Sequence, residues 1–592
     1  MGWDGPVAAH DGDQGTSKLN PNTDLITMTK LISPYGGQLI DLMLPASELA
    51  RVRQDEMDLP SLALSWQQVG QVELVLSGAY SPITGFMGRA DLYRVLSELR
   101  LSDGLSWPLP VVLALDSEKL GKVQVGDRVG LRDGEGLLIA ILDVAEIWPA
   151  DANAETAMAE SSGAPLGKAM ARDGQWYVAG QLLGVSEPPH HDFSDLRLTP
   201  AEIRSEFARR GWRNVIAYQP SLAMHRVHLE FLTGAAAHAQ ANLLLHVAGG
   251  ADPVGDPEHF SLVRACRAIL PRFPSATTLM AVSSSPRFAP GIRANLMRAI
   301  LARNFGCASV VVGGEAWDDG MDRRGGDGVS FPDHGPIADC AREIGVQTIP
   351  FPRMVYVEER DEYFSQDNAP TNSRELVMGG EELRRRLSRG LRIPDWFTYP
   401  EVLVEMARCH PPRHRQGFTV FFTGLSGAGK STVANVLAIR LMELGGRRVT
   451  LLDGDLVRRN LSSELGFSRE HRDLNIRRIG YVAEEITKHG GIAICAPIAP
   501  YRVTRDAVRR RIEPWGGFLE IHMATPIEVC ERRDRKGLYA KARAGIIREF
   551  TGVSDPYEIP QNPELAIDTS NCDVEEAVQS IVLKLEHEGY LK

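Results

Sequence analysis

The sequence predicts a multidomain α/β protein whose C-terminal part is built on a parallel sheet. The chain has 592 residues, more than one folded domain normally contains, so roughly two to four domains are expected. Apolar strand-like runs alternate with helical patterns from about residue 199 onward, which is typical of sheets flanked by helices. One glycine-rich loop stands between such a run and a helix: Gly424-Leu425-Ser426-Gly427-Ala428-Gly429-Lys430-Ser431. This pattern is typical of a phosphate-binding P-loop.

Composition excludes several classes of protein. A hydrophobic share of 43% with 24% charged residues is ordinary for a globular protein, and no apolar run approaches the roughly 20 residues that span a bilayer. We therefore expect no membrane partner. The formal net charge of −11 argues against nucleic-acid binding. The seven cysteines are widely spaced and form no Cys-x-x-Cys pair, so neither disulfides nor a zinc site is indicated, and a cytoplasmic location is predicted.

The first half of the chain divides by its patterns. Residues 1–25 are rich in Gly, Asp, Asn and Pro and lack an apolar signal core, so a disordered start is predicted. Residues 26–195 are predicted to form a β-rich domain, with candidate strands at 107–115 and 125–131. Residues 196–365 alternate between helix and strand and predict an α/β domain.

The second half begins with a connecting segment at 366–414. It contains a short charged helix at 381–389 and ends in the linker candidate 410–415. Residues 415–592 return to strand–helix alternation around three apolar runs, which predicts a parallel sheet.

The P-loop carries the first predicted chemistry, an ATP or GTP site. An apolar strand at 419–422 precedes it and a helical pattern at 432–439 follows, a context that a chance glycine-rich linker would lack. Glycines let successive N–H groups point at phosphate, Lys430 adds a charge, and the Ser431 hydroxyl can bind Mg²⁺. The expected nucleotide contacts are Gly424, Ser426, Gly427, Ala428, Gly429, Lys430, Ser431 and Thr432.

Two carboxylates are expected to face this loop. Asp453 and Asp455 follow the strand at 448–452, and doubly wound sheets place ligand groups at the carboxyl ends of their strands. One carboxylate can support the Mg²⁺ shell while the other accepts a proton from an attacking hydroxyl; the alternative is an Asp-Gly turn without chemistry. A run of arginines that could hold a multiply charged anion follows, some of them on solvated helix faces: Arg458, Arg472, Arg477, Arg478, Arg502 and Arg505.

From about residue 417 to its end, the chain resembles adenylyl-sulfate kinase, which phosphorylates the ribose 3′-hydroxyl of adenosine 5′-phosphosulfate. The motifs are Asp453-Gly454-Asp455-Leu456-Val457-Arg458, Phe467-Ser468, Asn475-Ile476-Arg477-Arg478-Ile479-Gly480, Ala499-Pro500-Tyr501-Arg502, the run 533–543, Phe550-Thr551-Gly552 and Pro556-Tyr557-Glu558. One departure is Ala499, where the family commonly has Ser.

This resemblance implies roles for single residues. Lys430 and Asp455 would be catalytic, with Asp455 as general base, and Asp453 would support Mg²⁺ together with Ser431. Arg533, Lys536 and Lys541 would contact ATP, the two lysines from a lid that excludes water. The expected substrate contacts are Arg458, Phe467, Arg472, Asn475, Arg478, Pro500, Tyr501 and Phe550, with the two phenylalanines stacking on adenine.

Residues from about 30 to 390 resemble ATP sulfurylase, which makes adenylyl sulfate from ATP and sulfate. The motifs are Ser33-Pro34-Tyr35-Gly36-Gly37, the runs 72–74 and 78–87, Trp107-Pro108-Leu109-Pro110, Gly211-Trp212 and Met224-His225-Arg226-Val227-His228. The resemblance implies a PUA-like N-terminal domain, followed by a nucleotidyltransferase-like domain with a His-x-x-His motif.

The sulfurylase-like site departs from its family at several positions. The family pattern Gln-x-Arg-Asn-Pro-x-His-Arg-x-His begins here at Gln219, so Ser221 replaces the arginine and Leu222 the asparagine, while His225 and His228 remain. A second pattern, Val-Gly-Arg-Asp-His, has become Val312-Gly313-Gly314-Glu315-Ala316. Loss of cationic and donor groups removes transition-state stabilisation, so this site is predicted to be degenerate.

Together these observations predict an adenylyl-sulfate kinase with a sulfurylase-like domain that serves as a scaffold. The alternative is a working bifunctional enzyme. A GTPase switch is disfavoured because no Asn-Lys-x-Asp segment follows the loop. The expected ligands are ATP, Mg²⁺ and adenosine 5′-phosphosulfate, and the expected assembly is a homo-oligomer, either a dimer or a hexamer.

Overall fold

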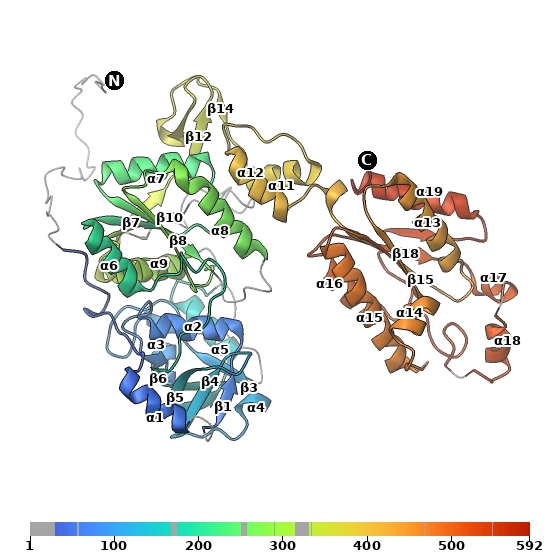
Figure 1. Cartoon of the computed structure of the whole chain (residues 1–592), viewed down its shortest axis with the longest axis horizontal. Helices are drawn as coiled ribbons and strands as arrows, with labels where there is room; N and C mark the ends of the chain where they lie inside the picture. The colour runs from blue at the N-terminus through green and yellow to red at the C-terminus, as the bar shows by residue number, and fades with distance from the viewer. Residues whose placement is uncertain are drawn as a thin grey trace.

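The computed structural model describes residues 30–55, 59–166, 175–249, 257–288, 291–313, 331–332, 334–466, 468–534, 536–547 and 549–592 (Figure 1). The predicted disordered start therefore lies outside the described residues. The strands of the described part form four sheets. In Figure 1 the chain passes from a blue β-rich body through a green α/β body to an orange and red α/β body.

The N-terminal body is a mixed sheet in the order β1-β4-β5-β6-β2, with β3 also paired to β6. Its strands are β1 (Ser61–Ala63), β2 (Gly85–Phe86), β3 (Leu113–Asp116), β4 (Arg128–Arg132), β5 (Leu138–Pro149) and β6 (Gln175–Gly184). Its helices are α1 (Ala46–Asp55), α2 (Trp66–Leu76), α3 (Arg89–Glu98), α4 (Ser117–Leu120) and α5 (Ala152–Ser161). The prediction of a β-rich domain is confirmed.

Both candidate strands of this body begin later than expected. The strand expected at 107–115 starts only at Leu113, because Pro108 and Pro110 have no N–H to donate to a neighbouring strand. The strand expected at 125–131 starts at Arg128, after a turn in which Gly126 has a φ of 94°.

The second body contains five parallel strands in the order β11-β10-β7-β8-β9. These are β7 (Val215–Tyr218), β8 (Asn242–Ala248), β9 (Thr278–Ser283), β10 (Ser309–Gly313) and β11 (Gln347–Phe351). Around them lie α6 (Pro200–Arg210), α7 (Arg226–His238), α8 (Pro257–Ile269), η2 (Leu270–Arg272), α9 (Ile292–Asn304) and α10 (Pro336–Ile344). Successive side chains of β7 point to opposite faces of the sheet and so belong to two different cores. Val215 packs with residues of α6 and α9, and Ile216 packs with residues of α7 and α8.

The first two bodies share one hydrophobic core. The cluster that contains Trp107 of the N-terminal body also contains Val215 of the second. The Asn304 side chain crosses the same junction, because it donates to the carbonyls of Ala79 and Ser81 at 2.9 and 3.0 Å and accepts from the Tyr35 N–H at 2.8 Å. These two parts therefore pack as one unit.

A small antiparallel sheet and two helices lead to the last body. The sheet comprises β12 (Met354–Val357), β13 (Glu362–Ser365) and β14 (Glu375–Leu376), with η3 (Gln366–Asn368) between β13 and β14. The predicted charged helix is α11 (Gly380–Arg389), and α12 (Pro400–Cys409) and η4 (Arg413–Arg415) follow it. The sequence did not predict α12.

The C-terminal body is a parallel five-stranded sheet in the order β16-β17-β15-β18-β19, as expected. Its strands are β15 (Phe418–Gly424), β16 (Val449–Asp453), β17 (Ile492–Ala496), β18 (Gly517–Met523) and β19 (Leu565–Ile567). Its helices are α13 (Lys430–Leu444), α14 (Gly454–Asn460), α15 (Arg469–Lys488), α16 (Arg502–Ile512), α17 (Ile527–Arg532), α18 (Leu538–Arg543) and α19 (Val574–His587). Phe418 and Phe422 pack with α13 and α19, while Phe421 packs with α15 and α16.

Candidate active site

The P-loop connects the buried end of β15 to the first turn of α13. Gly427 and Gly429 have φ values of 78° and 91°, a region that favours glycine. A Cβ on Gly424 would lie 2.7 Å from the Met523 carbonyl oxygen, so only glycine allows β15 and β18 to approach so closely there. The backbone N–H groups are thus presented at the start of α13, as phosphate binding requires.

Lys430 lies buried at the start of α13. Its Nζ donates to the carbonyl oxygens of Gly424 at 2.9 Å and Leu425 at 2.7 Å. Burial lowers the pKa of Lys430 to about 8. A bound phosphate would offer this ammonium a charged partner in place of two neutral carbonyls, so it would favour the protonated form.

Ser431 and Asp453 provide two oxygen atoms suited to Mg²⁺. The Ser431 hydroxyl donates to Asp453 Oδ2 at 2.6 Å, which joins α13 to the end of β16. Mg²⁺ prefers oxygen ligands and commonly takes one or two from the protein and the others from water and phosphates. In the part of the chain that the structure describes, no three His, Cys, Asp or Glu side chains gather as a metal cluster.

Two of the predicted site groups cannot be placed. The backbone of Asp455 lies in α14, but its side chain is outside the described part of the structure, as is the whole of Phe467. Arg458 and Arg478 are placed beside the segment just before Phe467. Arg458 Nη1 donates to the Gly466 carbonyl at 3.1 Å, and Arg478 Nη1 donates to the Leu461 carbonyl at 2.7 Å.

Arg472 and Asn475 form the polar centre of the candidate substrate site. They lie three residues apart on α15 and therefore on one face of the helix. Arg472 Nη1 donates to Thr551 Oγ1 at 2.7 Å and lies 3.0 Å from Asp555 Oδ2. Among the described residues, Nε and Nη2 of Arg472 and Oδ1 of Asn475 are buried without a hydrogen-bond partner. Buried polar groups are normally paired, so the two Arg472 nitrogens indicate a place for an anionic acceptor and the Asn475 oxygen a place for a hydrogen-bond donor of the ligand.

The predicted contacts Pro500 and Tyr501 lie against the same segment. The Tyr501 hydroxyl donates to Asp555 Oδ2 at 2.7 Å, and the Pro500 carbonyl accepts from the Glu558 N–H at 2.9 Å. The guanidinium of Arg472 lies 5.8 Å from the centre of the Tyr501 ring. Tyr501, Asp555 and Arg472 are thus brought together from three separate segments.

The three other residues expected to contact ATP lie on or near α17 and α18. Arg533 donates to Thr569 Oγ1 at 2.7 Å and to the Thr569 carbonyl at 2.8 Å, and Thr569 Oγ1 in turn donates to the Ala428 carbonyl at 3.3 Å. Lys541 is exposed on α18, and Lys536 is exposed just before that helix. The Lys536 charge acts with burial to lower the Lys430 pKa, so the two ammonium groups are near each other.

Phe550 is half-buried and packs edge-on to Tyr539, with ring centres 5.0 Å apart. It also packs against the core of the C-terminal body. Its predicted stacking on adenine therefore stays a prediction. The Tyr539 hydroxyl donates to the Ser426 carbonyl at 2.9 Å, which ties α18 to the P-loop.

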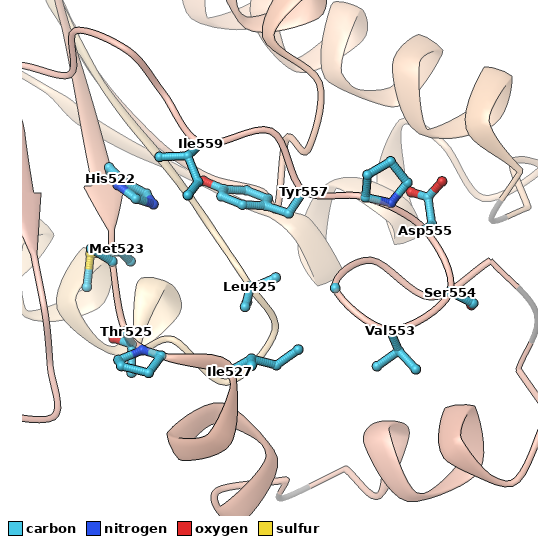
Figure 2. A pocket seen from close by; sticks show the side chains of 14 residues that line it. Leu425, His522, Met523, Thr525, Ile527, Val553, Ser554, Asp555, Tyr557 and Ile559 are labelled. Carbon is cyan, nitrogen blue, oxygen red and sulfur yellow. The ribbon is translucent and has the colours of Figure 1, made fainter.

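A cavity of about 670 Å³ opens beside the P-loop (Figure 2). Figure 2 shows Leu425 and Ile527 between strand β18 and the segment that carries Val553, Asp555 and Tyr557. Because Asp555 belongs both to this wall and to the contacts of Arg472, the cavity adjoins the candidate substrate site.

The sequence analysis missed Asp555, Thr551, Tyr539 and Thr569 as parts of this site. Asp555 stands between two quoted motifs, and a buried arginine such as Arg472 needs a nearby carboxylate. That requirement was a usable signal for Asp555. Nothing local in the sequence marks Tyr539 or Thr569, because their contacts with the P-loop exist only in the folded chain.

The second predicted site lies at the start of α7. The His225 N–H donates to His228 Nδ1 at 3.0 Å, and His225 Nδ1 lies 3.0 Å from Thr398 Oγ1. Burial lowers the pKa of His225 to about 3, with the neighbouring His228 acting in the same direction, so His225 is neutral at ordinary pH. The two histidines are buried at the N-terminus of α7.

The substituted positions lie close by in sequence. Leu222 is 46% exposed, so its apolar side chain faces outward instead of filling a core. Ser221 is half-buried, and Gln219 Nε2 donates to Ser285 Oγ at 3.4 Å. Gly314 and Ala316 lie outside the described residues.

Family models match three consecutive parts of the chain. A PUA-like domain covers residues 32–187, ATP-sulfurylase covers 194–409 and adenylylsulphate kinase covers 416–568. These matches confirm the predicted fold class of all three parts. No helix among the described residues combines the length and apolar character that crossing a membrane requires.

Several relatives match over nearly the whole chain. A sulfate adenylyltransferase of Phaeosphaeria nodorum is 40% identical over 567 residues, which cover 94% of this chain and 99% of that protein. A sulfate adenylyltransferase of Neurospora crassa is 40% identical over 573 residues, with coverages of 94% and 99%. The solved structure of a hexameric APS kinase from Thiobacillus denitrificans is 47% identical, covers 95% of this chain and 100% of that one, and superposes with a TM-score of 0.79.

Proposed function

This chain belongs to the family that joins an ATP-sulfurylase region to an adenylyl-sulfate kinase domain, and from that premise we propose that its activity is adenylyl-sulfate kinase. It would transfer the γ-phosphoryl group of ATP to the 3′-hydroxyl of adenosine 5′-phosphosulfate. The observation that carries the proposal is that one domain contains both a complete P-loop and a buried arginine, Arg472, whose Nε and Nη2 have no partner in the described structure.

Different residues of the site would perform different parts of the reaction. The P-loop N–H groups and Lys430 would hold the β- and γ-phosphates, while Arg472 and Asn475 would hold the phosphosulfate. Asp455 would accept the 3′-hydroxyl proton as that oxygen bonds to the γ-phosphorus and the bond to the β-phosphate oxygen breaks, which releases ADP. Ser431 and Asp453 would hold Mg²⁺, which when bound neutralises charge on the phosphates. Lys536 and Lys541 would cover the site and limit loss of ATP to water.

Product analysis tests the proposal. The purified chain is given ATP and adenosine 5′-phosphosulfate, and the products are separated. We expect 3′-phosphoadenylyl sulfate and ADP, with kcat lowered at least about 100-fold in Lys430→Ala and in Asp455→Asn. Arg440→Ala is the matched control, since Arg440 lies exposed on α13 and pairs only with Glu443 among the contacts described. Near-normal turnover in both site variants would contradict the assignment.

For the sulfurylase-like half we propose a scaffold without turnover. Support comes from Ser221 and Leu222, which offer sulfate no cation, and from the buried neutral His225. The alternative, a bifunctional enzyme, is favoured by the retained His225 and His228 and by relatives named sulfate adenylyltransferase. Pyrophosphate release from ATP and sulfate, run beside the reverse reaction, decides between them; robust sulfate-dependent turnover in either direction would contradict the scaffold.

We also propose that the chain assembles as a homo-oligomer in the cytoplasm. A similar chain is described as hexameric, and all seven cysteines are free here, which suits a reducing compartment. Light scattering on the eluting protein would distinguish a dimer from a hexamer, and a monomer would contradict the proposal.

A further inference from the structure

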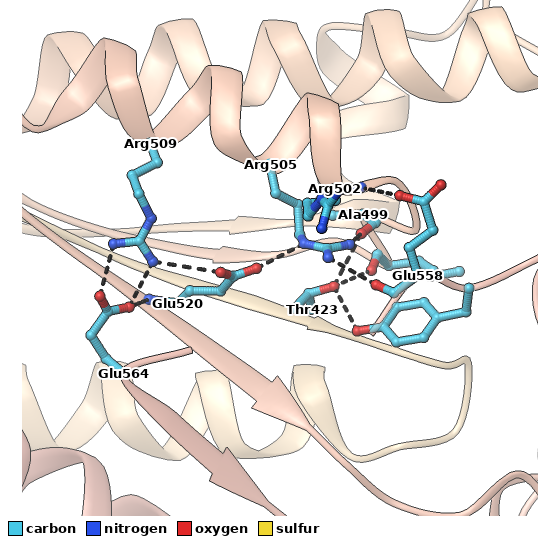
Figure 3. A network of polar contacts seen from close by, with 10 residues as sticks. Thr423, Ala499, Arg502, Arg505, Arg509, Glu520, Glu558 and Glu564 are labelled. Carbon is cyan, nitrogen blue, oxygen red and sulfur yellow. Dashed lines mark hydrogen bonds and ion pairs between the residues drawn. The ribbon is translucent and has the colours of Figure 1, made fainter. Parts of the chain in front are cut away.

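Arg505 lies inside the C-terminal body, although the sequence analysis placed it among the arginines that could hold an anion. It is 2% exposed on α16. Its Nε lies 2.7 Å from Glu520 Oε1, its Nη1 donates to the Ala499 carbonyl at 2.8 Å, and its Nη2 donates to the Glu558 carbonyl at 2.8 Å (Figure 3). All three nitrogens of the guanidinium thus lie against protein groups, Nε through an ion pair that lacks hydrogen-bond alignment and Nη1 and Nη2 through hydrogen bonds, so Arg505 does not contact the substrate directly.

The two carbonyls belong to segments that are distant in sequence and adjacent in space. Ala499 begins the turn at 499–501, and Glu558 ends the segment at 555–558, which begins with Asp555. Further hydrogen bonds join the same segments: the Glu558 N–H donates to the Pro500 carbonyl at 2.9 Å, and the Arg502 N–H donates to Glu558 Oε2 at 2.7 Å. Arg505 is the one charged side chain among these contacts that binds the backbone of both segments.

Each segment carries a group that contacts the candidate substrate site. Tyr501 and Asp555 are joined through the Tyr501 hydroxyl at 2.7 Å, and Asp555 lies 3.0 Å from Arg472 Nη1. The position of the Arg472 guanidinium, and hence the direction of its unpartnered Nε and Nη2, depends on Asp555. A chain of contacts thus leads from Arg505 to Arg472 without passing through the P-loop.

The backbone at Ala499 shows why a strong donor is needed. Ala499 has a φ of 45°, in the left-handed region that residues with a Cβ disfavour. Its carbonyl accepts from both Arg505 Nη1 and Thr423 Oγ1, at 2.8 and 3.1 Å. These two donors stabilise a turn that the local sequence would not hold by itself.

Glu520 and its neighbours hold the buried guanidinium in place. Glu520 Oε2 also lies 3.5 Å from Arg509 Nη2, and Arg509 forms a two-point pair with Glu564 at 2.8 Å (Figure 3). A buried ion pair contributes little net stability compared with well-packed apolar residues, so the role assigned to this one is to fix the geometry of the guanidinium.

We propose that Arg505 is a positioning residue for adenosine 5′-phosphosulfate, because it ties the 499–501 turn to the 555–558 segment and so holds Asp555 and Tyr501 against Arg472. This inference rests on the proposed kinase activity. It assigns Arg505 an effect on substrate binding that acts through Arg472 and leaves the ATP site in place.

Arg505→Lys tests the inference, since lysine keeps the charge beside Glu520 but its single nitrogen cannot bind both carbonyls in the same way. Arg510→Lys is the matched control on an exposed position of α16. We expect Arg505→Lys to raise the KM for adenosine 5′-phosphosulfate roughly 10- to 100-fold and to change the KM for ATP less than about 2-fold. Arg510→Lys should change neither, and circular dichroism checks that each variant is folded.

A double-mutant cycle with Asp555→Asn provides the second measurement. If Arg505 acts through Asp555, the two effects on KM will not add. Equal rises in both KM values, an unchanged KM for adenosine 5′-phosphosulfate, or fully additive effects would each overturn the inference. Because the wild-type chain is assayed beside the variants, absence of its kinase turnover would instead overturn the proposed function, and the inference with it.

Discussion

Arg472 offers the sharpest test of the substrate site, because its effects on binding and on stability should differ. The change is Arg472→Met, which keeps an unbranched apolar stem of similar reach and removes the guanidinium. Two buried N–H groups of Arg472 have no partner in the described structure and are expected to bind the phosphosulfate. A hydrogen bond to a charged group is worth about 1.5–3 kcal/mol, so loss of even one should weaken substrate binding roughly 10- to 150-fold.

The effect on folding should be much smaller. Arg472 loses its hydrogen bond to Thr551 and its ion pair with Asp555, but the Tyr501 hydroxyl still donates to Asp555. At the same time the variant removes two buried donors that lack partners, each of which costs about 1–3 kcal/mol of stability. Because these terms oppose each other, we expect the free energy of unfolding of the ligand-free protein to change by less than about 1.5 kcal/mol.

The assay combines urea unfolding with steady-state kinetics for adenosine 5′-phosphosulfate. Arg477→Met is the matched control, since Arg477 is exposed on the same helix. A large loss of stability with an unchanged KM would show that Arg472 is a structural residue and would refute the reasoning. Equal effects of Arg472→Met and Arg477→Met on KM would refute it as well.

Three further predictions concern the nucleotide, the metal and the adenine. ATP should bind with proton uptake at about pH 8 and lose affinity as pH rises further, because Lys430 has a pKa of about 8 in the ligand-free protein and a bound phosphate raises it. Calorimetry in buffers of different ionisation enthalpy measures the proton uptake. Proton uptake that persists in Lys430→Arg would contradict its assignment to Lys430. Asp453→Asn should raise the Mg²⁺ concentration for half-maximal rate about 10-fold or more, while an unchanged requirement would remove Asp453 from the metal site. Phe550→Ala should raise the KM for adenosine 5′-phosphosulfate about 5-fold or more, and an unchanged KM would assign Phe550 to the core.

The sequence predicted best where chemistry is local. The P-loop, its flanking strand and helix, and the Asp453 carboxylate at the end of β16 all follow from short patterns that need a fixed geometry. The prediction was wrong where proline interrupted a β-like run, as at Pro108 and Pro110, because apolar composition was weighed above the missing N–H groups.

Parts of the site that depend on tertiary contacts could not be predicted. Arg505 and Arg472 are both arginines in the same stretch of sequence. Arg505 forms an ion pair with Glu520 and hydrogen bonds to two carbonyls, whereas Nε and Nη2 of Arg472 have neither an ion-pair nor a hydrogen-bond partner among the described residues. Nothing in their local sequence separates these roles. The distinction comes from Asp555 and Glu558, which reach the two arginines only after β18 and the segment that follows it have folded.

The same distinction between structural and chemical residues accounts for the uneven resemblance to ATP sulfurylase. The retained motif residues Tyr35 and Trp107 are buried, as is Asn304. The Tyr35 hydroxyl donates to the Ser106 carbonyl at 2.7 Å, and the Asn304 side chain donates to two carbonyls across the junction of the first two bodies. The replaced residue at 222 is 46% exposed, so its change costs the fold little. A chain that needs this half only as a scaffold must keep the first group, because each loss there leaves a buried donor or a cavity. It can lose exposed residues of the sulfurylase pattern, such as the one at position 222, without unfolding. This difference between buried and exposed motif residues is the physical reason to expect a folded sulfurylase-like domain that has no sulfate-dependent turnover.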